Sequence, residues 1–203
     1  MTNLKKTKAL DDFEYVEKPL KRKSVFKGNV VDLRNDTAIT PKGMKVTREY
    51  VRHNGGVCIL AVNKEGKIAL VRQYRYPVST SVLELPAGKL EKRESPLKAA
   101  KRELEEEIGY VAGKITSAGA IYPCVGYSSE VIHLYIASNL KKTEVHFDDD
   151  EYIECKWFSE EELKWMLDNN MILDAKTIVL LYNIHLSSSS ENHLHSIYSS
   201  SSK

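Results

Sequence analysis

The sequence has few cysteines, little net charge and no long apolar run, and each shortage excludes a class of protein. The three cysteines, Cys58, Cys124 and Cys155, are an odd number and form no CxxC pair, so neither a disulfide framework nor a zinc site is indicated. Reduced thiols favour a cytoplasmic location. The formal net charge of +2 is too small to indicate nucleic acid or an acidic membrane surface as a partner.

The chain also lacks the apolar segments that membranes and secretion require. A transmembrane helix needs about 18 or more consecutive apolar residues, and no such run is present. The first residues, MTNLKKTKALDDFEY, do not contain the apolar core of a secretory signal. With 42% hydrophobic and 29% charged residues, the 203-residue chain has the composition of a soluble globular protein. We therefore expect neither a membrane nor a nucleic-acid partner.

Alternation of apolar and polar residues predicts strands over much of the chain. Residues 26–34 and 44–53 are typical of a hairpin, with turn residues at 36–43 between them. The more apolar segment 55–63 predicts a buried strand, and residues 67–74 are expected to follow it as an antiparallel partner. Further strands are predicted near residues 82–88, 115–122, 130–137 and 152–158.

Helical spacing appears in three places. Ser95 is a good N-cap for a helix over residues 96–108, and Gly109 is a natural stop. Ser159 and Asp174 are expected to cap two further helices, which extend to about residues 167 and 186. The serine-rich segment 187–203 has no face that could pack, so we expect it to stay mobile.

The predicted helix over residues 96–108 contains an unusual number of acidic residues. Glu103, Glu106 and Glu107 are three and four residues apart and share one face, where like charges destabilise a helix by about 0.2–0.5 kcal/mol per pair. A divalent cation relieves this repulsion, and Mg²⁺ prefers carboxylate oxygens and is commonly shared with substrate phosphates. The same glutamates could also form an ordinary solvated face, and the run ELEEE alone does not decide between the two.

The surrounding spacing favours the metal site. The segment GKLEKRESPLKAAKRELEEEIGY, Gly88 to Tyr110, resembles the Nudix box, the loop–helix signature of hydrolases that cleave nucleoside diphosphates linked to another moiety. Its charged and glycine positions are all present: Gly88, Glu94, Arg102, Glu103, Glu106, Glu107 and Gly109. Tyr110 departs from the pattern, because the family usually has an aliphatic residue there.

The resemblance implies roles for these residues. Glu103, Glu106 and Glu107 are expected to bind Mg²⁺, with Mn²⁺ as a possible substitute, and the backbone carbonyl of Ala87 to be a further ligand. Glu107, Arg102 and Glu94 are expected to be catalytic, the last two by orienting the ligand carboxylates. Gly88 is expected to let the backbone turn toward the metal, and Glu105 to face solvent.

Segments outside the box resemble the ADP-ribose pyrophosphatase branch of the family. They are REYVRHNGGV, VRQYRYPV and VLELPAGKLE. In this comparison Arg72, Gln73 and Arg75 are expected to contact the substrate sugar and phosphates, although they could instead be rim charges on an edge strand. Glu130, which follows the loop residues YPCVGYSS, is expected to be the general base on the attacking water. Val125 stands where many relatives have proline, which weakens the choice of ADP-ribose.

The resemblance implies an α+β Nudix fold, in which a mixed β-sheet is sandwiched between α-helices. Residues 1–50 are expected to form a β-rich arm for homodimerisation, residues 51–186 the catalytic domain, and residues 187–203 a tail. The expected reaction is Mg²⁺-dependent hydrolysis of ADP-ribose to AMP and ribose 5-phosphate. Alternatives are hydrolysis of another nucleoside diphosphate sugar or related diphosphate, a Nudix-like module that binds a nucleotide without cleaving it, and a structural protein with an acidic helix.

Overall fold

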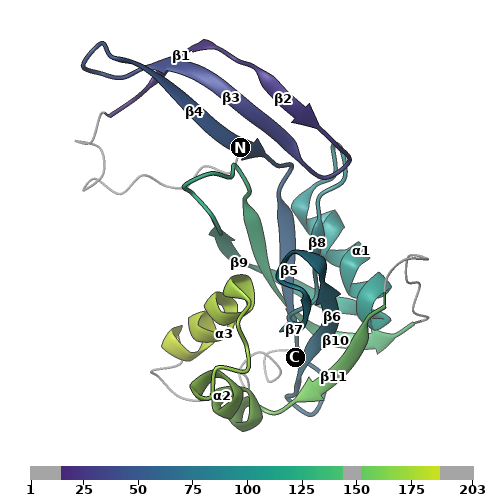
Figure 1. The fold of residues 1–203 in the computed structure, drawn as a ribbon. Helices are drawn as coiled ribbons and strands as arrows, with labels where there is room; N and C mark the ends of the chain where they lie inside the picture. The colour runs from purple at the N-terminus through teal and green to yellow at the C-terminus, as the bar shows by residue number, and fades with distance from the viewer. Residues whose placement is uncertain (1–14, 144–151, 188–203) are drawn as a thin grey trace. The chain divides into compact units, whose positions relative to one another are not determined.

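The computed structural model describes residues 15–143 and 152–187, so parts of the expected arm and tail lie outside the described residues. The chain forms two compact units (Figure 1). The first holds the described residues up to His53 together with Cys124–Ser129, and the second holds the rest.

The first unit is an antiparallel sheet built around one long strand, β3 (Asp32–Ile39). Strand β4 (Lys45–Arg52) pairs along one side of β3, while β1 (Lys18–Lys21) and β2 (Ser24–Lys27) pair along the other. The predicted hairpin is confirmed in the pairing of β3 with β4, but its first strand was expected over residues 26–34, and the chain turns over residues 28–31 between β2 and β3. The turn before β4 is also shorter than expected. Residues 36–39 continue β3, and the chain reverses over residues 40–44, where Gly43 has a φ of +80°.

A short loop from later in the sequence completes this unit. The backbone N–H of Val51 donates to the carbonyl of Tyr127 at 2.7 Å, and the N–H of Ser129 donates back to the Val51 carbonyl at 2.9 Å. The Ser129 hydroxyl also accepts from the N–H of His53 at 3.0 Å. The loop before Glu130 is therefore tied to the end of β4.

The second unit contains two sheets. The first has the order β8-β5-β10-β9, with β5 and β10 parallel and the other pairs antiparallel. Its strands are β5 (Gly56–Ala61), β8 (Ala87–Lys89), β9 (Tyr110–Ile121) and β10 (Ile132–Lys142). The second sheet is antiparallel, in the order β11-β6-β7, and consists of β6 (Ile68–Arg75), β7 (Thr80–Glu84) and β11 (Glu154–Phe158). A single 3₁₀ turn, η2 (Tyr76–Val78), links β6 to β7.

The predicted antiparallel pairing of residues 55–63 with 67–74 is wrong. The two segments meet only at an isolated bridge between Val62 and Ile68, and they enter different sheets. The physical reason is that β5 is a central strand. β10 pairs along its whole length on one edge, and β8 pairs with Gly56–Cys58 on the other, so β6 pairs with β7 and β11 instead.

The three predicted helices are confirmed, together with their caps. Helix α1 (Pro96–Ile108) begins after Ser95, whose hydroxyl accepts from an N–H of the first turn, and ends at Gly109 with a φ of 70°. Helix α2 (Glu160–Asp168) has a capping box formed by Ser159 and Glu162. Helix α3 (Ala175–Ser187) follows Asp174, whose carboxylate accepts from the Thr177 N–H at 3.0 Å.

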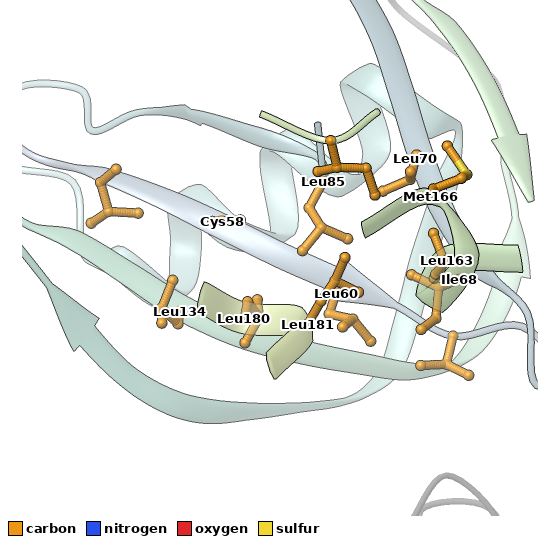
Figure 2. Packing of buried hydrophobic residues seen from close by; sticks show 13 residues of the cluster. Cys58, Leu60, Ile68, Leu70, Leu85, Leu134, Leu163, Met166, Leu180 and Leu181 are labelled. Carbon is orange, nitrogen blue, oxygen red and sulfur yellow. The ribbon is translucent and has the colours of Figure 1, made fainter. Parts of the chain in front are cut away.

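Strand β5 separates two hydrophobic clusters. Val57, Ile59 and Ala61 belong to a cluster with α1, in which Ala99, Ala100 and Leu104 are buried. Cys58, Leu60 and Val62 belong to a second cluster with α2 and α3, shown in Figure 2, in which Leu163, Leu180 and Leu181 are buried. The expected α+β architecture, a mixed sheet between helices, is confirmed. No helix in residues 15–143 or 152–187 is long and apolar enough to cross a membrane.

Candidate active site

The second unit contains a cavity of about 650 Å³ that collects most of the residues singled out in the sequence. It is lined by the end of β6, by β8, by the acidic face of α1 and by the start of α3. The expected site residues that line it are Gln73, Arg75, Ala87, Arg102, Glu103, Glu106, Glu107 and Glu130. This volume is typical of a site for a small organic ligand.

Pairing between β8 and β5 fixes the backbone beside the acidic helix. Ala87 is opposite Cys58 and Gly88 is opposite Val57. The N–H of Ala87 donates to Oε2 of Glu107 at 2.9 Å, which links the strand to the helix. Glu107 is only 4% exposed, so its carboxylate is held at a defined place in the wall of the cavity.

Gly88 is needed for a different reason from the one expected. Its backbone is an ordinary strand of β8 and not a turn with positive φ. A Cβ at this position would lie 1.9 Å from both Cδ and Oε1 of Glu103. The Glu103 carboxylate therefore occupies the space that any other side chain would take.

The substitution Gly88→Ala is expected to lower kcat/KM by about 100-fold, because a misplacement of about 1 Å at a catalytic group can have an effect of that size. The added methyl group must push Glu103 away from its position. Steady-state kinetics and thermal unfolding would measure the effect on each property. Gly126→Ala is the control, because a Cβ there meets nothing within 4 Å and its activity should be unchanged.

Arg102 holds the box carboxylates together. Its Nε and Nη2 donate to the two oxygens of Glu94 at 3.1 and 3.0 Å. Its Nη1 donates to Glu103 at 2.8 Å and to Glu106 at 2.7 Å. Hydrogen bonding from the guanidinium keeps the pKa of Glu94 below its ordinary value, and the acids raise the pKa of Arg102. The guanidinium thus reaches both sides of the cluster, as expected for an orienting group.

Glu105 lies away from the other glutamates of α1. It is half-buried, and its carboxylate accepts from the Thr143 hydroxyl at 3.4 Å. It does not line the cavity. Glu105 is therefore a glutamate of the same helix that lies outside the site.

The donor set around the cavity suits a hard divalent cation. Oxygen is the ligand that Mg²⁺ and Mn²⁺ prefer, and the Ala87 backbone lines the cavity together with six carboxylates, those of Glu91, Glu103, Glu106, Glu107, Glu130 and Asp174. Within residues 15–143 and 152–187, however, no three acidic, histidine or cysteine side chains are arranged as a complete metal site. Glu103 and Glu106 contact Arg102 instead, so ion binding requires a small rearrangement of these side chains.

Comparison with known proteins identifies the family. Residues 52–180 match the NUDIX domain family. The chain belongs to the Nudix family. It is 38% identical over 172 residues to a Bacillus subtilis protein named ADP-ribose pyrophosphatase, an alignment that spans 84% of this chain and 93% of the relative. The chain is a Nudix pyrophosphohydrolase of the ADP-ribose pyrophosphatase branch.

Two further matches agree with the family. A Bacillus methanolicus protein named methanol dehydrogenase activator is 38% identical over 174 residues, with 85% of this chain and 94% of the relative aligned. A crystal structure described as an ADP compounds hydrolase has a TM-score of 0.74 and 19% identity, and covers 84% of this chain and 93% of that one. At this identity the structural match shows the Nudix fold alone.

Sequence reasoning missed a group of charges that adjoins the Nudix cavity, which Arg75, Asp174 and Lys176 line. Glu84, at the end of β7, is 2% exposed and accepts from Nε and Nη2 of Arg75 at 2.6 and 2.8 Å. Lys176, in the first turn of α3, donates to Glu84 at 2.5 Å and to Asp174 at 2.8 Å. Only the apolar neighbours of Glu84 in VLELPAG hinted that its carboxylate would be buried, and its partner Lys176 is 92 residues away.

Arg72 does not join this group. Side chains alternate along β6, so Gln73 and Arg75 point into the Nudix cavity while Arg72 lies on the other face. There it lines a second cavity, of about 950 Å³, between the β11-β6-β7 sheet and helix α2. The three residues expected at the substrate therefore lie on two different faces of one strand.

Proposed function

We propose that this Nudix hydrolase cleaves the diphosphate bond of a nucleoside diphosphate sugar, with ADP-ribose as the substrate and AMP and ribose 5-phosphate as products. The observation that carries the proposal is a single cavity with box carboxylates on one wall and the cation Arg75 on another. A diphosphate needs both kinds of group, cations for its own charge and carboxylates for the accompanying metal. The name of the Bacillus subtilis relative supports ADP-ribose as the compound.

In this proposal Glu103, Glu106, Glu107 and the Ala87 carbonyl would hold Mg²⁺, with Mn²⁺ as a possible substitute. When bound, the cation would neutralise charge on the diphosphate. Arg102 and Glu94 would keep the carboxylates in place through the contacts described above. The observed positions of Glu103 against Gly88 and of Glu107 on the Ala87 N–H support this ligand set.

Glu130 would accept the proton of the attacking water. It lines the same cavity, and its Oε1 lies 3.9 Å from the position that a Cβ on Gly56 would take. The absence of a side chain on Gly56 thus leaves room next to this carboxylate. Gln73 and Arg75 would contact the phosphates or sugar, Arg75 through the forked geometry that suits phosphate oxygens. Arg72 would contact substrate only if the substrate extended to the other face of β6.

A substrate panel with product identification by mass tests the proposal. We expect ADP-ribose to give AMP and ribose 5-phosphate with Mg²⁺, and EDTA to abolish turnover. A higher kcat/KM for GDP-mannose or a dinucleotide would replace ADP-ribose by that compound. Nucleotide binding without any hydrolysis would contradict catalysis and support a binding module.

We also propose a cytoplasmic homodimer, assembled through the β-rich arm of residues 1–50. Every residue of β1 and β2 is exposed. Among the described residues of the arm, seven large apolar side chains are more than half exposed: Tyr15, Val16, Leu20, Val25, Phe26, Val30 and Met44. An apolar surface of this kind is typical of an interaction site. Light scattering should give twice the monomer mass of 23.1 kDa, and a monomeric mass would reject the dimer.

A further inference from the structure

The geometry points to a substrate-binding role for Lys176, which no motif assigns. We infer that the Lys176 ammonium and the Arg75 guanidinium together receive the anionic diphosphate, and that Glu84 is the positioning residue that holds both cations. This inference deepens the proposed function and rests on it. It adds a second cation from α3, at the start of the last helix, to a site otherwise built from the Nudix box and β6.

The first observation is that one buried carboxylate binds two cations from separate elements. Glu84 accepts two hydrogen bonds from Arg75 and one from Lys176. Burial alone would raise the pKa of Glu84, yet the two cations hold it below its ordinary value, so the residue is ionised near neutral pH. Burial would likewise lower the pKa of Lys176, but Asp174 and Glu84 raise it overall, so the ammonium is charged.

The second observation is that both cations keep hydrogen-bonding capacity toward the cavity. Lys176 has three N–H donors. Within the part of the chain that the structure describes, two of them donate to Glu84 and Asp174. Arg75 uses Nε and Nη2 on Glu84, which leaves Nη1 without an acceptor among the residues that the structure describes. Both residues line the Nudix cavity, and their side chains are 13% and 41% exposed. A phosphate oxygen could accept from each without displacing Glu84.

The third observation is that fold stability does not explain this arrangement well. A buried group of charges is often no more stable than apolar residues of the same volume. A lysine in the first turn of a helix also opposes the helix dipole, which favours negative charge there. Asp174, the cap of α3, offsets that effect by contacting Lys176. Lys176 is thus a cation that does little for fold stability but lies at the edge of a ligand cavity, where an anion could bind it.

Calorimetric binding of ADP in EDTA tests the inference, because it measures the contribution of the cations without metal. Lys176→Met removes the charge and keeps the length of the side chain, and we expect it to weaken ADP binding by about tenfold or more. Lys176→Arg should recover part of that loss. Lys164→Met, at an exposed lysine of α2 that lines neither cavity, is the matched control and should bind ADP like the wild type.

A second pair of variants separates positioning from folding. Glu84→Gln should also weaken ADP binding, and the double variant with Lys176→Met should bind no more weakly than Glu84→Gln alone, because both changes disable one unit. If the role of Glu84 were purely structural, Glu84→Gln would lower the melting temperature but leave the ADP affinity and the KM of the folded fraction unchanged. That result would overturn the positioning role of Glu84. Should Lys176→Met fail to fold, Lys176→Arg and Glu84→Gln still carry the test.

The outcomes distinguish this inference from the proposed function. Wild-type ADP affinity in a folded Lys176→Met protein would overturn the inference, as would a wild type that does not bind ADP in EDTA. A wild type that binds ADP through Lys176 but hydrolyses nothing in the substrate panel would contradict the proposed function and leave the anion site supported.

Discussion

Replacing Glu107 by glutamine is expected to lower kcat by about 10³-fold and to leave the fold intact. A metal ligand contributes several kcal/mol to the stabilisation of charge in a transition state, and about 1.4 kcal/mol corresponds to each tenfold in rate. The fold should survive because glutamine keeps a carbonyl oxygen that can accept from the Ala87 N–H, which donates to Glu107 in the wild type.

Glu105→Gln is the matched control, since it makes the same chemical change on the same helix but outside the cavity. Its activity should stay within about twofold of the wild type, because Glu105 does not line the cavity and glutamine can still accept from the Thr143 hydroxyl. Initial rates with saturating Mg²⁺ and substrate, together with calorimetric Mn²⁺ binding, would measure both variants. Equal rates for Glu107→Gln and Glu105→Gln would reject Glu107 as a metal ligand.

The parts of the fold that local chemistry determines could be predicted. Helix α1 was bounded correctly from Ser95 and Gly109, because an N-cap side chain and a left-handed C-cap depend on residues only a few positions away. The same holds for Ser159 at the start of α2. The acidic face of α1 followed from helical periodicity alone, and α1 does present Glu103, Glu106 and Glu107 to one cavity.

The parts that depend on distant residues could not be predicted. The partners of β5 are β8 and β10, and the strand β10 that pairs with it in parallel begins 76 residues after β5 does, at Ile132 against Gly56. The pattern of apolar and polar residues within residues 55–74 does not indicate these strand partners. The contacts of Glu84 could not be predicted for the same reason, because Lys176 reaches Glu84 only after α3 packs against the sheet. The need for glycine at position 88 also arises from Glu103, a residue on another element.

These failures have a common physical origin that bears on function. Caps and periodicity act through neighbours in sequence, and they determine the acidic half of the site, which is recognisable from one 23-residue segment. The cationic half is assembled from the ends of β6 and β7 and the start of α3, so its residues carry no joint sequence signal. The diphosphate site that we propose needs both halves, and only the structure brings Arg75, Glu84 and Lys176 together with the glutamates.

Replacing Glu130 by glutamine is expected to lower kcat by about 10²–10⁴-fold, the range that general acid–base assistance typically contributes. Glutamine has nearly the same shape and can accept a hydrogen bond, but it cannot take a proton from water. KM should change little if the residue acts on the water and not on the substrate. Glu154→Gln, at an exposed glutamate of β11 paired with Lys156, should retain wild-type rates.

Metal affinity separates the two roles that a carboxylate in this cavity could have. If Glu130 is the base, Glu130→Gln should bind Mn²⁺ like the wild type while its kcat falls, whereas Glu107→Gln should lose both affinity and rate. A parallel loss of Mn²⁺ affinity in Glu130→Gln would make Glu130 a ligand instead, and near-wild-type turnover would remove it from the reaction. Because the two glutamates line one cavity from different parts of the chain, this contrast tests whether α1 supplies the metal site and the loop before β10 supplies the base.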